Sequence, residues 1–425
     1  PFAHAEERDR GDPQLETAEY LTERIDKLGG PESYNHFAVG WAHALNTPYQ
    51  WTKQVASHFG GTRNGTIVHW PKGIQAKGEL RTHFAHVIDV APTILEAAGI
   101  PEPVSVDGIQ QDPIDGVSML KTFNDAKAPE VHETQYFEVM GNRAIYHKGW
   151  TAVTKHYTPW IPNVKPALDD DVWELYDTTT DWAQAKDLSK EMPDKLRELQ
   201  RLWIIEATRN KVLPIDDRMF EKINPDTAGR PTLVKGKTQL LAGGMSHLGE
   251  NCVLNLKNKS HSVTAAIVVP QGGAEGVIIA QGADIGGWSL YAKGGKLKYC
   301  YNWGGFKHFM IEGASVMAPG EHQVRMEFAY AGGGLGKGGK VTLYVDGQQD
   351  GEGEVGATLA MIFSADDGLD VGKDGGSAVS PDYKPGNNSF NGKVKGVQLA
   401  IDEAAEDLDH LLDPADVIRM AMARQ

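Results

Sequence analysis

Residues 47–65 read Thr47-Pro-Tyr-Gln-Trp-Thr-Lys53-Gln-Val-Ala-Ser-His58-Phe-Gly-Gly61-Thr-Arg63-Asn-Gly65. A lysine, a histidine and an arginine surround a glycine pair in this segment, and the apolar run Ile67–Trp70 follows it. Glycines let a backbone approach a ligand closely, and cationic side chains and free main-chain N–H groups are what a sulfate or phosphate oxygen binds. The pattern predicts an anion-binding loop before a β-strand, and a helix predicted to begin after Asp89 would complete an α/β layer.

Further blocks of sequence occur in a defined order around this loop. In chain order they are Gly40-Trp-Ala-x-Ala44, Thr47-Pro48, Lys53, Gly60-Gly-x-Arg63, His86-Val-Ile-Asp89-Val-Ala-Pro92-Thr-Ile-Leu-Glu-Ala-Ala-Gly99, Gln135-Tyr-Phe-Glu-x-x-Gly141-x-Arg143 and Trp173-Glu-Leu-Tyr-Asp177. Together they resemble the type I sulfatases, an arylsulfatase-like family with an alkaline-phosphatase-like fold. The resemblance covers roughly the first half of the chain and implies the carboxy-terminal portion of a sulfatase.

The sequence lacks the groups with which this family performs its chemistry. Type I sulfatases use a formylglycine made from a Cys or Ser that has Pro two positions later and Arg four positions later. Neither Cys252 nor Cys300 has these neighbours, and no serine has them. The family also holds calcium or another divalent cation with an early aspartate pair and a later Asp-Asn dipeptide, which is absent here. The resemblance therefore places both the formylglycine and the cation on an upstream segment.

Lys53 is the residue to which the resemblance assigns a catalytic role. The family lysine at this position contacts the sulfate and neutralises charge that develops on the leaving oxygen. One extra residue separates Lys53 from the glycine pair, whereas Thr47-Pro48 keeps its register on the other side; an exposed, solvated lysine is the alternative. His58 is the second predicted substrate-binding residue, because a histidine can donate to a sulfate oxygen or protonate a leaving alkoxide. A structural loop histidine is the alternative for His58.

Two other clusters have residue types that bind metals, but we predict no metal ligand in this chain. His83, His86 and Asp89 have helical spacing, and we favour Asp89 as a helix cap instead. The acidic segment Asp366–Asp370 with Asp374 could supply oxygen ligands for calcium. No complete ligand pattern is present there, so we favour a solvated acidic turn.

Composition indicates a folded protein, since 40% of its 425 residues are hydrophobic and 23% are charged. The net charge of −15 argues against nucleic acid and anionic membranes as general partners. No apolar run is long enough for a membrane span, and a soluble protein of the bacterial cytoplasm or periplasm is expected, with the compartment left open. Two cysteines give no disulfide framework; we favour reduced, buried thiols and leave a Cys252–Cys300 bridge open.

Pattern and composition divide the chain into three regions. Residues 1–125 are the expected end of the sulfatase catalytic α/β domain, and residues 126–225 are its carboxy-terminal subdomain. In this subdomain we predict a small antiparallel sheet and a helix from Pro193 that covers it, because its apolar residues recur at spacings of three and four. Residues 235–425 are expected to form an all-β jelly-roll sandwich that ends in a helix, Pro414–Ala423.

The jelly-roll prediction rests on glycine-rich sequence with short, recurring β-type runs. These runs are Val263–Val269, Gly276–Ala280, Trp288–Ala292, Lys296–Tyr301, Gln323–Tyr330 and Val341–Val345. The block resembles a laminin-G or concanavalin-like domain. Its aromatic residues could stack on a glycan, but core packing is the expectation that we favour; they are Trp288, Tyr291, Tyr299, Tyr301, Trp303 and Phe306.

The leading hypothesis is that the chain is part of a sulfatase that hydrolyses sulfate esters, with an upstream segment as its partner. Because nucleophile and metal ligands are absent, the chain alone is expected to be inactive. One alternative is a non-catalytic glycan-binding or assembly protein. Another keeps the superfamily but changes the substrate to a phosphate or phosphonate ester.

Overall fold

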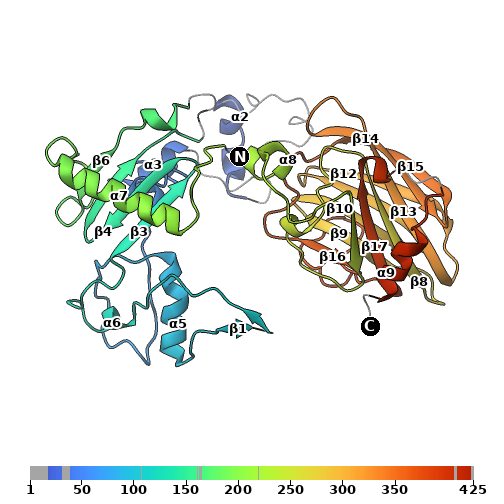
Figure 1. The fold of residues 1–425 in the computed structure, drawn as a ribbon, viewed down its shortest axis with the longest axis horizontal. Coiled ribbons are helices and arrows are strands. Elements are labelled where there is room, and N and C mark those ends of the chain that lie inside the picture. Colours follow the sequence, from blue (N-terminus) through green and yellow to red (C-terminus); the bar gives the residue numbers. More distant parts are fainter. Residues whose placement is uncertain are drawn as a thin grey trace. The chain divides into compact units, whose positions relative to one another are not determined.

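The structure is a computed structural model that describes residues 18–30, 39–106, 108–159, 161, 165–218, 220–405 and 409–422. These residues form two compact units, one made mainly of Asp26–Met219 and the other mainly of Phe220–Gln425 (Figure 1). The predicted division of residues 1–225 into two domains stays a prediction. Among the described helices, none combines the length and the apolar composition that a bilayer span requires.

The first unit contains short helices followed by a four-stranded sheet and a long helix. In chain order its elements are η1 (Ile25–Lys27), α3 (Val39–Asn46), α4 (Phe59–Thr62), η2 (Val87–Asp89), α5 (Val90–Ala98), β1 (Ser105–Val106), β2 (Ile109–Gln110), α6 (Leu120–Phe123), β3 (Thr134–Val139), β4 (Asn142–His147), β5 (Trp150–Thr154), η3 (Leu168–Asp170), β6 (Glu174–Asp177) and α7 (Pro193–Arg209). The helix α2 (Ala18–Thr22) precedes them.

Helix α7 covers the antiparallel sheet β3-β4-β5-β6, as the sequence predicts. Pro193 occupies the first turn, where its missing N–H costs no hydrogen bond. Spacings of four residues place three apolar side chains of α7 on one face, and each large one contributes roughly 1.5–3 kcal/mol by burial. The core they form with the sheet comprises Ile145, Ala152, Leu175, Leu199, Trp203 and Ala207.

The predicted strand Ile67–Trp70 is wrong, because these residues belong to no strand of the structure. A strand needs a neighbour to take up its main-chain hydrogen bonds, and residues 66–69 have none among the described residues. The helix predicted after Asp89 is confirmed as α5. It ends at Gly99, whose φ of 66° is the left-handed conformation that favours glycine.

The second unit is an antiparallel sandwich of two sheets, in the strand orders β12-β11-β10-β9-β16 and β15-β14-β13-β8-β17-β7. Its elements are η4 (Phe220–Lys222), α8 (Pro225–Ala228), β7 (Thr238–Ala242), η5 (Glu250–Cys252), β8 (His261–Val269), β9 (Gly276–Ala283), β10 (Gly286–Lys293), β11 (Lys296–Trp303), β12 (Lys307–Val316), β13 (Gly320–Tyr330), β14 (Lys337–Val345), β15 (Gln348–Ala357), β16 (Leu369–Val371), β17 (Lys393–Ile401), η6 (Asp402–Ala405) and α9 (Pro414–Met422).

One continuous apolar core lies between the two sheets and draws side chains from both. Val263 and Ile267 of β8 meet Ile279 and Leu290 of the other sheet in this cluster, which is the arrangement of a face-to-face sandwich. Each strand predicted in this region is present, and the jelly-roll prediction is confirmed. The turn Asp346-Gly347 joins β14 to β15 with φ values of 50° and 77°, as a two-residue hairpin of the primed type requires.

The last helix and the cysteines complete the second unit. The Asp413 side chain accepts the Ala415 N–H at 2.6 Å at the start of α9, and α9 packs on β7 and β17; Ala423, the predicted last residue, lies outside the described residues. Both cysteines are free, but the prediction of buried thiols is correct only for Cys300, because Cys252 is exposed. Burial raises the pKa of the Cys300 thiol to about 12.

Candidate functional site

The loop Gln50–Val55 folds back on helix α4, and the glycine pair makes this contact close. A Cβ on Gly60 would lie 2.1 Å from the carbonyl oxygen of Trp51, and one on Gly61 would lie 2.0 Å from that of Val55. The Gly60 N–H also donates to the Gln50 carbonyl at 3.0 Å. The glycines therefore let the chain approach itself, and this packing fixes the loop that carries Lys53.

Lys53 stands on a backbone that is held on both sides while its side chain is exposed. Thr52 and Val55 are buried, and the main chain at Trp51 and Gln54 has left-handed φ values of 66° and 75°. Such conformations are costly for non-glycine residues and persist only where the surrounding structure holds them. Within the described part of the chain, the Lys53 side chain has no hydrogen bond or ion pair, so its ammonium group is available to an anion.

A cavity of about 380 Å³ opens beside this loop. Its lining residues are Val39, Gly40 and His43 of α3, followed by Gln50, Trp51 and Thr52. Lys53 is not one of them, although it directly follows Thr52. The Lys155 ammonium lies 4.7 Å from the centre of the Trp51 ring, so a second cation flanks the aromatic wall of the cavity.

One buried asparagine links the two lysine-bearing segments. Asn142 on β4 is fully buried; its side-chain N–H donates to the Gln54 carbonyl at 3.3 Å, and its Oδ1 accepts the His156 N–H at 2.9 Å. Gln54 follows Lys53, and His156 follows Lys155. Asn142 therefore sets the separation of the two segments that carry the cations.

His58 lies in the interior, where it is 1% exposed. Its Nδ1 is 2.9 Å from Ser57 Oγ, and its Nε2 is 3.0 Å from Glu174 Oε2. The hydrogen bond with His58 lowers the pKa of Glu174, and Tyr176 donates to the same carboxylate oxygen at 2.6 Å. This geometry matches the structural alternative, and sulfate binding by His58 stays a prediction.

The histidine and aspartate cluster near α5 has structural contacts. Asp89 is fully buried and accepts the N–H groups of His86 and Val117 and the ring Nδ1–H of His132, each at 2.8 Å. Its bond to the His86 N–H closes a capping box in which His86 is the N-cap of η2. Asp89 stands at the N-cap position of α5 but makes no side-chain capping hydrogen bond there, so the predicted cap of α5 is correct in position only. His83 instead contacts a main-chain carbonyl. In the described ranges, no group of three or more His, Cys, Asp or Glu side chains is placed to hold a metal ion.

The prediction of a solvated acidic turn at Asp366–Asp370 is correct for the exposed Asp366 but wrong for the end of the segment. Asp370 and Asp374 are both buried, and main-chain N–H groups donate to their carboxylates. Tyr383 adds a hydrogen bond to Asp374 at 2.7 Å. These hydrogen bonds replace the water that would solvate the two carboxylates. Asp370 and Asp374 therefore stabilise the conformation of the loop around them.

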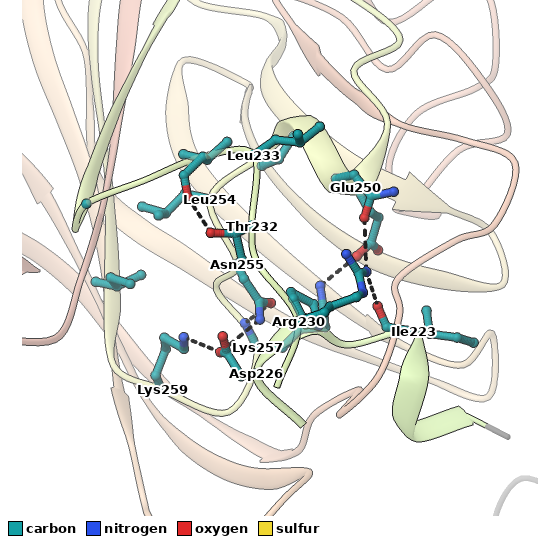
Figure 2. A pocket seen from close by; sticks show the side chains of 16 residues that line it. Ile223, Asp226, Arg230, Thr232, Leu233, Glu250, Leu254, Asn255, Lys257 and Lys259 are labelled. Atoms are coloured by element: carbon teal, nitrogen blue, oxygen red, sulfur yellow. Dashed lines mark hydrogen bonds and ion pairs between the residues drawn. The ribbon is translucent and has the colours of Figure 1, made fainter. Parts of the chain in front are cut away.

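A hollow of about 110 Å³ lies in the second unit, where the segment after residue 220 meets the chain before β8 (Figure 2). Each charged side chain that lines it has a partner inside the protein. Lys259 pairs with Asp226 and Lys257 with Glu250, both at 2.6 Å, and Arg230 donates to a main-chain carbonyl at 3.0 Å. Because these charges satisfy one another, we assign this hollow no ligand.

Four of the six aromatic residues considered for glycan stacking are core residues. Trp288, Tyr291, Tyr299 and Tyr301 are each at most 4% exposed, as the core-packing expectation requires. The other two, Trp303 and Phe306, are partly exposed and form an edge-to-face pair at the turn between β11 and β12. Of these six residues only this pair is exposed enough to stack on a glycan, and glycan binding by the sandwich stays a prediction.

Comparison with known proteins bears on the first unit. Residues 51–203 match the family model described as N-sulphoglucosamine sulphohydrolase, C-terminal. This segment is therefore similar to the carboxy-terminal region of that sulfohydrolase family. An uncharacterized sulfatase of Schizosaccharomyces pombe is 29% identical over 208 residues, which are 48% of this chain and 35% of that protein. The chain thus spans about a third of the length of this curated relative.

Solved structures similar to the chain include a Bacteroides thetaiotaomicron protein connected with the metabolism of multiple glycosaminoglycans. It is 23% identical, with a TM-score of 0.28 over 36% of this chain and 31% of that one. A Ruminococcus gnavus IT-sialidase CBM40 bound to α2,3-sialyllactose is 9% identical, with a TM-score of 0.27 over 44% of this chain and 98% of that one. Scores this low carry no argument about function.

Three residues of the region that matches the family model emerge only from the structure. Trp51 and Lys155 flank the cavity, and Asn142 joins their segments. Trp51 could have been found from the sequence, because it lies only two positions before Lys53. The role of Asn142 has no such signal, because it depends on a main-chain contact between residues far apart in sequence.

Proposed function

We propose that this chain is the carboxy-terminal portion of a sulfuric ester hydrolase. An upstream segment supplies the formylglycine nucleophile and the divalent cation, and this chain supplies the cationic side of the sulfate site. The observation that carries the proposal is the sulfatase match over residues 51–203, within which Lys53 occupies an exposed position on a rigidly held loop beside a cavity.

Lys53 stabilises the negative charge that develops during the reaction. In sulfate ester hydrolysis the nucleophile attacks sulfur, the bond from sulfur to the ester oxygen breaks, and that oxygen leaves as an alkoxide that takes up a proton. An ammonium group near the sulfate stabilises the negative charge as it moves to the leaving oxygen. A rigid backbone around Lys53 favours this role, because a preorganised cation needs no rearrangement during the reaction.

Lys155 and Trp51 assist in binding the substrate. Lys155 adds positive charge where the protein as a whole is negative, so an anionic ester is captured by a local field. Trp51 offers an aromatic wall to the organic part of the ester. The described residues do not fit a resident metal ion, so no step of the reaction is assigned to a metal on this chain.

The test is an assay with an aryl sulfate on the chain alone and on the chain combined with a segment that carries the formylglycine motif. The chain alone is expected to show no hydrolysis, and the combination is expected to be active. In the combination, Lys53→Ala should lower kcat about 10²–10³-fold, the effect of removing one group that stabilises developing charge.

Lys77→Ala is the matched control, since Lys77 is also an exposed lysine of the same unit, and it should leave kcat unchanged. Hydrolysis by the chain alone would contradict the proposal. Faster turnover of the corresponding phosphate ester would move the assignment to a phosphate or phosphonate hydrolase.

A further inference from the structure

Residues 63–125 have no buried apolar side chain among those described. The buried residues in this range are Asp89, Thr93 and Thr122, all of them polar. Large apolar side chains are nevertheless abundant and exposed in it; they include Ile67, Val68, Leu80, Val87, Val90, Ile94, Ile100, Val104, Val106 and Ile109. Large apolar side chains are usually buried, and a group of exposed ones marks an interaction site when they form one patch.

The first component of this surface is an unpaired β-type segment. Residues 66–69 make no main-chain hydrogen bond to any described residue. Ile67 is 95% exposed, and the next residue, Val68, is exposed as well. β-Branched residues with free main-chain N–H and C=O groups can pair with the edge of a sheet.

The second component is helix α5, which has one covered face and one exposed apolar face. One face carries Thr93, whose hydroxyl accepts the Met119 N–H at 2.9 Å, and packs toward α6. The other carries Val90, Ile94 and Ala98 at spacings of four residues, and all three are exposed. A helix with an uncovered apolar face normally packs against a second layer of helices or a sheet, and here that layer is missing among the described residues.

An unpaired strand followed by a half-covered helix fits one kind of partner. Strand and helix in succession are the unit from which α/β sheets are built, with the strand inside the sheet and the helix on its face. The described sheets of this unit pair their strands antiparallel and leave residues 66–69 out. Since the chain spans about a third of the relative that it matches, the relative's remaining length contains a partner of the required size.

We propose that Ile67, Val68, Val87, Val90, Ile94 and Ile100 form the docking surface for the upstream sulfatase segment. In this complex residues 66–69 add a strand to the edge of that segment's sheet, and α5 covers the sheet beside it. The inference rests on the proposed function for the identity of the partner. It adds which residues of this chain join the two parts of the catalytic domain; helix α5, which carries two of them, is labelled in Figure 1.

The test measures association of the 425-residue chain with the separately expressed segment that carries the formylglycine motif. Ile94→Lys should weaken this association at least tenfold without changing the thermal midpoint of the chain alone, because Ile94 is exposed there. Ile205→Lys on α7 is the matched control, since both isoleucines are 60% exposed on helices of the same unit. Hydrogen exchange of residues 66–69 should be fast in the chain alone and slow in the complex.

Equal association of the Ile94→Lys and Ile205→Lys variants would overturn the proposal, as would unchanged exchange at residues 66–69. A dimer of the chain alone that Ile94→Lys dissociates would assign the surface to a second copy. Sedimentation with neutral lipid vesicles that Ile94→Lys abolishes would assign it to a membrane. Association without sulfatase activity would leave the docking surface in place and refute the proposed function instead.

Discussion

At the scale of single residues, the pair Asp89–His132 is a buried ionisable contact of the first unit. Burial by itself would raise the pKa of the Asp89 carboxyl, but the hydrogen bonds from His132, His86 and Val117 outweigh it and lower this pKa below 3.8. Burial would likewise lower the pKa of His132, and the Asp89 carboxylate raises it above 6.5. The pKa of the nearby His86 ring is lowered by burial and by His132, while the Asp89 carboxylate opposes this shift.

The pKa directions define the pH window in which this pair stabilises the fold. Asp89 contributes fully above its unfolded pKa of 3.8 and loses its contribution as pH falls through its lower folded value. His132 contributes fully below its unfolded pKa of 6.5 and loses its contribution as pH rises through its higher folded value. The pair therefore stabilises most between these two unfolded values.

The prediction for this pair uses His132→Gln. Urea unfolding should show a larger loss of stability for this variant at about pH 5.5 than at about pH 8.5, because the charged pair in the wild type weakens as pH rises above the unfolded pKa of His132. Unfolding is followed by tryptophan fluorescence, with His69→Gln as the control at an exposed histidine. An equal loss at both pH values would contradict a charged pair.

At the scale of elements, the loop Gln50–Val55 and helix α4 behave as one packed unit. Main chain rests on main chain at Gly60 and Gly61, so the contact leaves no room for a side chain. The loop in turn is tied to strand β4 through Asn142. The sheet thereby positions Lys53 through two successive contacts, neither of which involves the lysine side chain.

Gly60→Ala tests this contact. The added methyl group would meet the carbonyl oxygens of Trp51 and Gln50 at 2.1 and 2.2 Å, so the loop must shift, at a cost of about 1–3 kcal/mol in unfolding free energy. Gly65→Ala is the matched control, because nothing lies within 4 Å of its Cβ position. Denaturant titration of both variants should show the loss for Gly60→Ala alone, and similar curves would refute the packing argument.

The success of the sequence predictions differs between elements for physical reasons. Helix α7 was predictable because Leu199, Trp203 and Ala207 repeat with the helical period, which is a local property. Residues Ile67–Trp70 have the composition of a strand but form no strand in the structure. A strand forms only where a neighbouring strand takes up its main-chain hydrogen bonds, and a single sequence does not show whether that neighbour is present. The contacts of His58 with Glu174 and of Asn142 with Gln54 join residues 116 and 88 positions apart, and a single sequence contains no record of them.

At the scale of the whole molecule, the two units differ in how completely they cover their apolar surface. The largest core cluster has all its buried members between Leu241 and Ile401, entirely within the second unit. The first unit has its own core under α7, but its residues 63–125 contribute no buried apolar side chain to it. The second unit is therefore complete as a folding domain, and the first is not.

The corresponding prediction concerns residues 220–425 expressed alone. They should unfold in one cooperative thermal transition with a near-ultraviolet circular dichroism signal, because their core needs no side chain from the first unit. Differential scanning calorimetry checks this expectation, and the full chain serves as the reference for the same transition. A gradual, non-cooperative melt would show that the sandwich depends on the rest of the chain.

The isolation of the Lys53 side chain has a consequence for how this protein can evolve. The folding of the loop is determined by Gly60, Gly61 and Asn142, while the lysine side chain makes no bond to any described residue. Selection for a stable loop and selection for turnover therefore act on different codons. A lineage can exchange Lys53, and with it the activity, without losing the architecture that presents it.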